Sequence, residues 1–219
     1  MSLTLHFHPL SSFCHKVLIA LYENGTPFTP KLVDLGDADQ RAAFHALWPI
    51  GKFPVLQDSG RDRMVPESSI IIEYLDQHYP GRTRFIPDGA EEARVVRFGD
   101  RFYDLHIHHH MQKIVGDRLR PAGAKDPHGV ADARTRMAAA LALADKHIAG
   151  RTWAMGESFT LADCAAAPAL FYADKVAPFA GTYPNLIGYL DRLKQRPSYA
   201  RTLKEAEPYF QFFPKEEAA

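Results

Sequence analysis

The sequence contains little cysteine, no excess of charge of either sign and no long apolar run. Only two of its 219 residues are cysteine, Cys14 and Cys164, which excludes a disulfide-rich scaffold and favours reduced thiols in the cytoplasm. The 26 lysine and arginine residues balance 26 aspartate and glutamate residues, so we expect neither nucleic acid nor a membrane as a partner. No segment has the pattern of a secretory leader or the apolar length of a membrane span. A small ligand is therefore the expected partner.

The periodicity of apolar residues changes near residue 80. Before it, the order is βαβαββα, with strands predicted at 3–7, 28–33, 53–57 and 63–65 and helices at 12–23, 38–47 and 67–79. After it, strand alternation is missing, and helices are predicted at 91–119, 130–149, 161–176, 185–195 and 198–206. We therefore expect an α/β domain over 1–80, a linker over 81–89 and an all-helical domain over 90–219.

Two short segments point to a binding site for a peptide-like ligand. Pro54 stands beside a strand start, where it removes an amide donor and can adopt the cis form, so the backbone edge at Phe53 can face a ligand. A helix is predicted to begin at Glu67 or Ser68, and its first amides and positive dipole end suit a carboxylate. Each segment alone also fits a plain turn proline or helix cap.

One further helix start is explicit but structural. Thr160 is followed three residues later by Asp163, which is the spacing of a capping box. We expect these two side chains to cap the helix over 161–176 and assign Asp163 no catalytic role.

The motifs together resemble the glutathione transferase superfamily over essentially the whole chain, in its serine-type, bacterial theta- and zeta-like members. The residues that carry this resemblance are Ser11-Ser12-Phe13-Cys14-His15-Lys16-Val17, Gly51-Lys52-Phe53-Pro54-Val55-Leu56, the segment from Glu67-Ser68 to Leu75, and Ser158-Phe159-Thr160-Leu161-Ala162-Asp163. The resemblance implies a thioredoxin-like N-terminal domain, a helical C-terminal domain and a homodimer.

The resemblance also implies which residues bind glutathione, the co-substrate of that family. The backbone of Phe53, before a cis Pro54, would pair with the cysteinyl part. Glu67 and Ser68 would hold the γ-glutamyl end, and Lys52 would lie near the glycyl carboxylate. No metal is implied.

Ser11 is the candidate residue for activating the glutathione thiol. The thiolate is the nucleophile, and a hydroxyl donor at a positive helix end favours that anion. Ser12 shares the turn and is the first alternative. Cys14 is the second, because a helix start can lower a thiol pKa, although a packed cysteine is the favoured interpretation.

The second-substrate pocket is implied by resemblance alone. The helix over 91–119 borders it in the family, so Tyr103, His106 and His110 are expected to contact an electrophile. His106 and His110 share a helix face, but no third ligand accompanies them and we predict no metal site. The aromatic tail over 209–213 is expected to pack on the helical core or, alternatively, to wall the pocket.

The expected function is that of a glutathione transferase acting on a small, partly apolar electrophile. Alternatives are a glutathione-dependent thiol reductase or an isomerase of the maleylacetoacetate type, whose paired serines Ser11-Ser12 resemble, although Phe13 and Cys14 depart from that motif. A non-catalytic glutathione-binding or interaction module is the alternative from another class.

Overall fold

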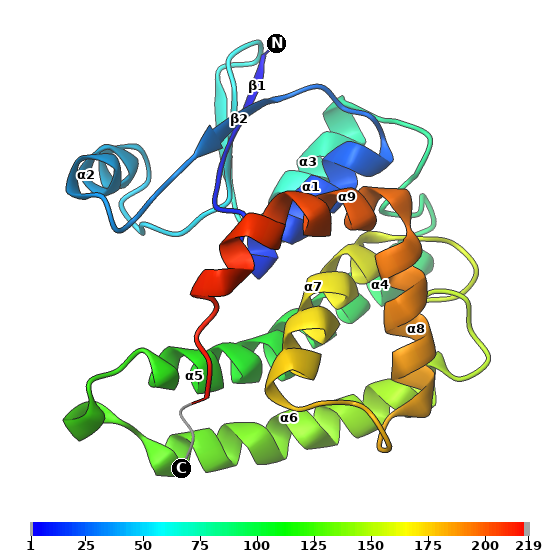
Figure 1. Ribbon diagram of the computed structural model, residues 1–219. Helices are drawn as coiled ribbons and strands as arrows, with labels where there is room; N and C mark the ends of the chain where they lie inside the picture. The colour runs from blue at the N-terminus through cyan, green and yellow to red at the C-terminus, as the bar shows by residue number, and fades with distance from the viewer. Residues whose placement is uncertain (1, 217–219) are drawn as a thin grey trace.

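A four-stranded mixed sheet forms the N-terminal part of the computed structural model, which describes residues 2–216. Its strands, in the spatial order β2-β1-β3-β4, are β1 (Leu3–Phe7), β2 (Thr29–Leu32), β3 (Val55–Asp58) and β4 (Arg63–Pro66). β2 runs parallel to β1, whereas β3 is antiparallel to both β1 and β4. Helices α1 (Ser12–Glu23) and α3 (Ser68–His78) cover one face and α2 (Ala38–Leu47) the other (Figure 1). This is the predicted thioredoxin-like βαβαββα order.

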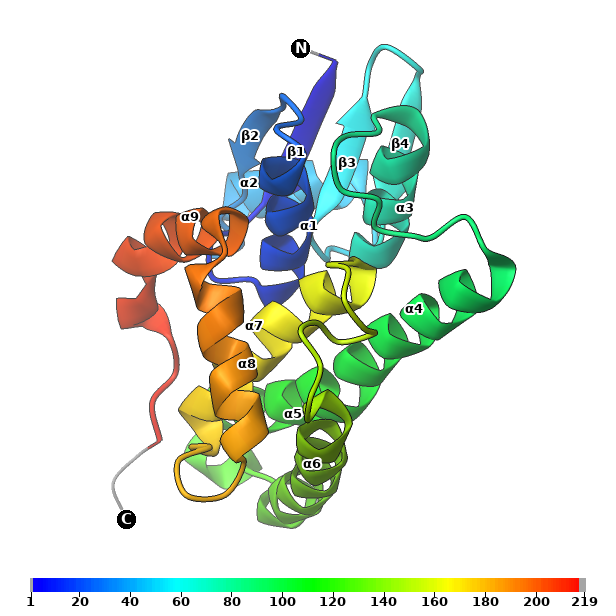
Figure 2. The same ribbon diagram turned by 90° about the vertical axis from the view of Figure 1, so that its right-hand side faces the viewer.

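The remaining elements are helical (Figure 2). They are α4 (Ala90–Phe102), the π-helix η1 (Tyr103–His108), α5 (His109–Arg118), the 3₁₀ turn η2 (Ala122–Ala124), α6 (Pro127–Ile148), α7 (Leu161–Val176), α8 (Pro184–Gln195), α9 (Pro197–Ala206) and the 3₁₀ segment η3 (Glu207–Phe212). The predicted fold class is confirmed. Within residues 2–216, none of the helices combines the length and apolarity needed to cross a membrane.

Two local expectations needed correction. The third strand begins at Val55 and not at Phe53, since the Phe53-Pro54 bond is cis and Pro54 has no amide hydrogen for the ladder. The long helix predicted over 91–119 contains the π-helix, which apolar spacing did not reveal.

The predicted capping box is present at the start of α7. Asp163 Oδ2 accepts from the Thr160 amide at 2.9 Å, while Oδ1 accepts from the Ala154 amide at 2.8 Å and the Tyr189 hydroxyl at 2.6 Å. Asp163 thus joins three segments of the helical domain.

Helix α1 lies between the sheet and the helical domain, where it packs on α7 and α9. Its fully buried Lys16 ammonium lies 2.5 Å from Asp100 Oδ1 and 2.7 Å from Asp104 Oδ2. It also donates to Ser69 Oγ at 2.9 Å. Burial opposes the charge, but the two carboxylates outweigh it and raise the Lys16 pKa above its ordinary value. A charged cluster therefore joins α1 and α3 to the helical domain.

Two buried histidines accompany this interface. His108 Nε2 lies 2.5 Å from Ser12 Oγ, and His15 Nε2 donates to the Pro9 carbonyl at 2.6 Å. Burial lowers the pKa of His15 to about 4 and that of His108 to about 3, in the second case with help from the Lys16 charge. Both imidazoles are therefore neutral at neutral pH.

Replacing Lys16 is expected to destabilise the fold strongly. Lys16→Met leaves two buried carboxylates without their cation, which should lower the free energy of unfolding by about 3–5 kcal/mol. Arg136→Met is the control, because it breaks an exposed 2.8 Å pair with Asp132 and should cost about 1 kcal/mol or less. Urea unfolding at neutral pH measures both. Equal losses in the two variants would contradict the role given to Lys16.

The buried histidines should make the fold acid-sensitive. Their folded pKa values are depressed, so the unfolded chain binds more protons once the pH falls below about 6.5. Stability should then decrease by about 1.4 kcal/mol per pH unit per histidine until the folded pKa is reached. His15→Gln should remove about one proton from the pH dependence of the free energy of unfolding in urea titrations between pH of about 7 and 5. An unchanged slope in His15→Gln would refute the assignment.

Candidate active site

Three chain segments meet at one end of the sheet because of strand pairing. His6 in β1 pairs with Val55 in β3, and Val55 pairs with Pro66 in β4. The turn after β1, the Phe53-Pro54 bond before β3 and Glu67 after β4 therefore come to the same edge. The sequence motifs that are far apart in the chain thus become neighbours.

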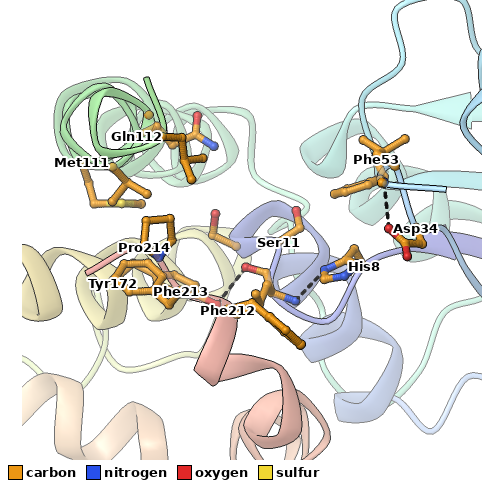
Figure 3. A pocket seen from close by; sticks show the side chains of 17 residues that line it. His8, Ser11, Asp34, Phe53, Met111, Gln112, Tyr172, Phe212, Phe213 and Pro214 are labelled. Carbon is orange, nitrogen blue, oxygen red and sulfur yellow. Dashed lines mark hydrogen bonds between the residues drawn. The ribbon is translucent and has the colours of Figure 1, made fainter. Parts of the chain in front are cut away.

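A cavity of about 640 Å³ opens beside the turn that follows β1 (Figure 3). On the sheet side it is lined by His8, Leu10, Ser11, Ser12, Asp34, Leu35, Gly36 and Phe53, and on the helical side by Met111, Gln112, Val115, Gly116, Leu119, Tyr172, Phe212, Phe213 and Pro214. The cavity is therefore shared between the two domains, with hydroxyl groups at its base and a largely apolar helical wall.

Ser11 is placed to act on a molecule in this cavity. It is the N-cap of α1, and its Oγ accepts a hydrogen bond from the Cys14 amide at 3.3 Å. Its own hydroxyl donates to no nitrogen or oxygen acceptor among residues 2–216, although the Cys14 sulfur lies within its reach, and Figure 3 shows the side chain directed into the space between Gln112 and Phe53. Ser11 thus combines a hydroxyl donor at the cavity with the positive end of a helix.

The two alternatives to Ser11 are less suited to act on a thiol. Ser12 also borders the cavity, but it is buried and its hydroxyl is occupied by His108. Cys14 is fully buried, which raises its thiol pKa to about 12. A thiol with that pKa is protonated at neutral pH and shielded from reagents, so Cys14 is a packing residue.

Four hydrogen bonds fix the turn that carries Ser11. The Ser11 amide donates to the His8 carbonyl at 3.0 Å, and the Leu10 amide donates to His8 Nδ1 at 3.1 Å. The Pro9 carbonyl accepts from His15, and the Leu10 carbonyl accepts from the Tyr172 hydroxyl at 2.8 Å. Burial lowers the His8 pKa despite the nearby Asp34 carboxylate, so the His8 ring is neutral. The turn is therefore held from both domains.

The remaining residues expected to bind glutathione surround the same edge of the sheet but do not line the cavity. Lys52 is exposed just before Phe53, and Ser68 is buried as the first residue of α3. Glu67 precedes Ser68 with φ of 70°, a conformation that costs a non-glycine residue about 1–3 kcal/mol. Such strain is typical of residues that a functional site holds in place.

The residues expected at the second-substrate pocket lie away from the cavity at Ser11. Tyr103 is buried in a separate apolar pocket beside α6, and His106 and His110 face Arg136. None of the three lines the cavity at Ser11. Met111 and Gln112 of α5 line the cavity instead.

Several cavity residues were not predicted. Asp34, Gln112 and Tyr172 stand in segments that carry no motif, and no spacing in the sequence brings them to Ser11. The tail was predicted in outline, and Phe213 both packs on Tyr172 and lines the cavity. Among the described residues, no group of three or more histidine, cysteine or acidic side chains is arranged to hold a metal.

Comparison with known proteins relates this architecture to one family. The model for the glutathione S-transferase N-terminal domain matches residues 5–83, and that for the C-terminal domain matches residues 127–192. The chain is 32% identical to the glutathione S-transferase-like protein LUC7 of Fusarium over 72% of its length and 71% of that protein. It is 29% identical to a probable maleylacetoacetate isomerase of Vibrio cholerae, over 95% of this chain and 98% of that one.

A solved structure agrees in both domains. The glutathione S-transferase of Methylobacillus flagellatus, crystallised with glutathione bound, superposes with a TM-score of 0.83 at 26% identity, covering 92% of this chain and 98% of that one. Both family models match at the positions where the sheet and the helices lie. The chain belongs to the glutathione S-transferase family.

Proposed function

We propose that this protein binds glutathione at the edge of its sheet and activates the thiol for attack on a small, partly apolar electrophile. The observation that carries the proposal is the Ser11 hydroxyl, which faces a cavity of about 640 Å³ at the N-terminus of α1. Glutathione bound to the similar Methylobacillus protein supports the choice of co-substrate.

The energy required of Ser11 is modest. Lowering a thiol pKa by one unit takes about 1.4 kcal/mol of preferential interaction with the thiolate. A hydrogen bond to a charged group contributes about 1.5–3 kcal/mol, and the helix end adds to it. Neither a metal nor a general base is needed for this step.

The tripeptide is proposed to lie along the end of the sheet. Its cysteinyl backbone would pair with Phe53 before the cis Pro54, and its γ-glutamyl end would reach Glu67 and Ser68. Lys52 is exposed beside Phe53, where it suits the glycyl carboxylate. The sulfur would then lie at the Ser11 turn.

The electrophile is proposed to occupy the helical side of the cavity. Met111, Val115, Tyr172 and Phe213 give that wall an apolar surface, whereas Gln112 offers an amide. An apolar wall with one polar group suits a small, mainly apolar molecule.

Isomerisation is the second candidate reaction. The match to a maleylacetoacetate isomerase and the adjacent Ser11 and Ser12 hydroxyls favour it.

Thiol reduction through a mixed disulfide is less suited, since serine occupies position 11 and Cys14 is buried. Product analysis separates conjugation from isomerisation. The non-catalytic alternative would bind glutathione without lowering its thiol pKa.

A matched pair of serine variants tests the proposed mechanism. Ser11→Ala should raise the thiol pKa of bound glutathione by about one unit, with glutathione still bound. At pH values below the thiol pKa of the native complex, kcat/KM should then fall about tenfold. Ser12→Ala should leave the thiol pKa within about 0.3 unit of the native value. The ultraviolet absorbance of the thiolate against pH, with calorimetric binding, measures both. A shift lost in Ser12→Ala and retained in Ser11→Ala would transfer the role to Ser12.

We further propose that the protein is cytoplasmic and that the segment 81–89 links its two domains. We also propose that it forms a homodimer. Figure 2 shows β4, α3 and α4 along one side of the molecule, where Met64, Ile70 and Phe98 are 42%, 54% and 62% exposed. The 2.8 Å pair between Arg97 and Glu73 links α4 to α3. An apolar surface of this kind suits a second copy of the chain.

Light scattering after size-exclusion chromatography tests the dimer. The native chain should elute as a dimer, and Phe98→Glu should dissociate it by burying a charge at the interface. Ile50→Glu is the control, because Ile50 is 61% exposed on the loop before β3. A monomeric native chain, or a dimer that survives Phe98→Glu, would contradict this interface.

A further inference from the structure

Tyr172 connects the Ser11 turn to the helical domain. Its hydroxyl donates to the Leu10 carbonyl at 2.8 Å, one residue before Ser11. The neighbouring Pro9 carbonyl is held from within α1 by His15. Tyr172 lies in α7, so it supplies a bond to this turn that comes from the other domain. A displacement of its hydroxyl would therefore be passed to the backbone that carries Ser11.

The ring of Tyr172 is in turn held by the C-terminal tail. Phe213 stacks on it with the ring centres 5.4 Å apart and an angle of 25° between the planes. Figure 3 shows Phe213 and Pro214 beside Tyr172 at the cavity. Tyr172 and Phe213 both line the cavity. This aromatic pair therefore links the tail, to which Phe213 belongs, with the cavity and the Ser11 turn.

The tail has its own anchors on the far side of this pair. Arg118 donates to the Pro214 carbonyl at 3.0 Å, and Glu216 pairs with Arg118 at 3.0 Å and with Arg134 at 2.7 Å. These bonds tie the tail to α5 and α6. The position of Phe213 is therefore fixed by both the tail anchors and the Tyr172 ring.

We propose that Tyr172 is a positioning residue for thiolate activation and that Phe213 couples the tail to it. The hydroxyl of Tyr172 sets the Leu10 carbonyl and thereby the direction of the Ser11 hydroxyl. The Phe213 ring keeps Tyr172 in the rotamer that makes this bond. This inference rests on the proposed function, because it concerns how Ser11 is aimed at the glutathione sulfur.

Tyr199 supplies a matched comparison for a purely structural role. It is as buried as Tyr172, and its hydroxyl also donates to a backbone carbonyl, that of Ala167, at 3.2 Å. That carbonyl lies inside α7 and is not part of the Ser11 turn, although the Tyr199 ring packs on His15. Loss of either hydroxyl leaves one carbonyl without this partner, but only the loss at Tyr172 should affect the thiol.

The first test compares Tyr172→Phe with Tyr199→Phe in the full chain. Tyr172→Phe should raise the pKa of bound glutathione by about 0.5 unit and lower kcat/KM about threefold below that pKa, with glutathione affinity little changed. Tyr199→Phe should leave the thiol pKa at the native value. An equal thiol pKa in Tyr172→Phe and native protein would overturn the inference alone. A native protein that leaves the thiol at its free pKa would overturn the proposed function and this inference with it.

The second test addresses the tail. Phe213→Leu keeps an apolar wall but removes the stacked ring, so it should raise the thiol pKa as well as the KM for an apolar electrophile. Combined with Tyr172→Phe, its effect on the thiol pKa should be less than additive, since both act through one bond. A higher KM with an unchanged thiol pKa in Phe213→Leu would reduce Phe213 to a wall of the cavity and overturn the coupling.

Discussion

The Lys16 ammonium is fully buried between α1 and the helical domain, where it contacts Asp100, Asp104 and Ser69. Four residues before it on α1, Ser12 meets His108. Asp104 and His108 are also four residues apart. The contacts Ser12–His108 and Lys16–Asp104 are therefore spaced by about one turn on both α1 and the helix that it faces. Because one of these pairs is ionic and buried, sliding or separating the domains would leave uncompensated charge. The cavity depends on this register, since its walls come from both domains.

Both residues that meet α1 in this register, Asp104 and His108, lie in the π-helix. His106 and His110 share a face, as the sequence interpretation assumed, since both line a pocket with Arg136. The π-turn accommodates about one additional residue, which rotates the following side chains by about 100° relative to an uninterrupted helix. His108 then faces Ser12, and Met111 and Gln112 face the cavity. The backbone therefore decides which of the clustered histidines reaches the site.

Sequence reasoning succeeded where the information is local. Apolar periodicity placed the order of strands and helices, and the spacing of Thr160 and Asp163 identified a cap that the structure contains. Strand pairing then carried Phe53 and Glu67 to one edge without further assumptions. It failed at Tyr172 and Gln112, which reach the cavity through helix packing that no motif encodes. It also missed the π-turn, because the apolar residues over 91–119 were interpreted as one continuous α-helical pattern.

The proposed site has the glutathione sulfur at the Ser11 hydroxyl, and a crystal structure of the complex with glutathione tests this most directly. It predicts the sulfur within hydrogen-bonding distance of Ser11 Oγ, the cysteinyl backbone beside Phe53 and the γ-glutamyl end at Glu67 and Ser68. A sulfur directed away from the turn, or glutathione bound outside the sheet edge, would contradict the central claim.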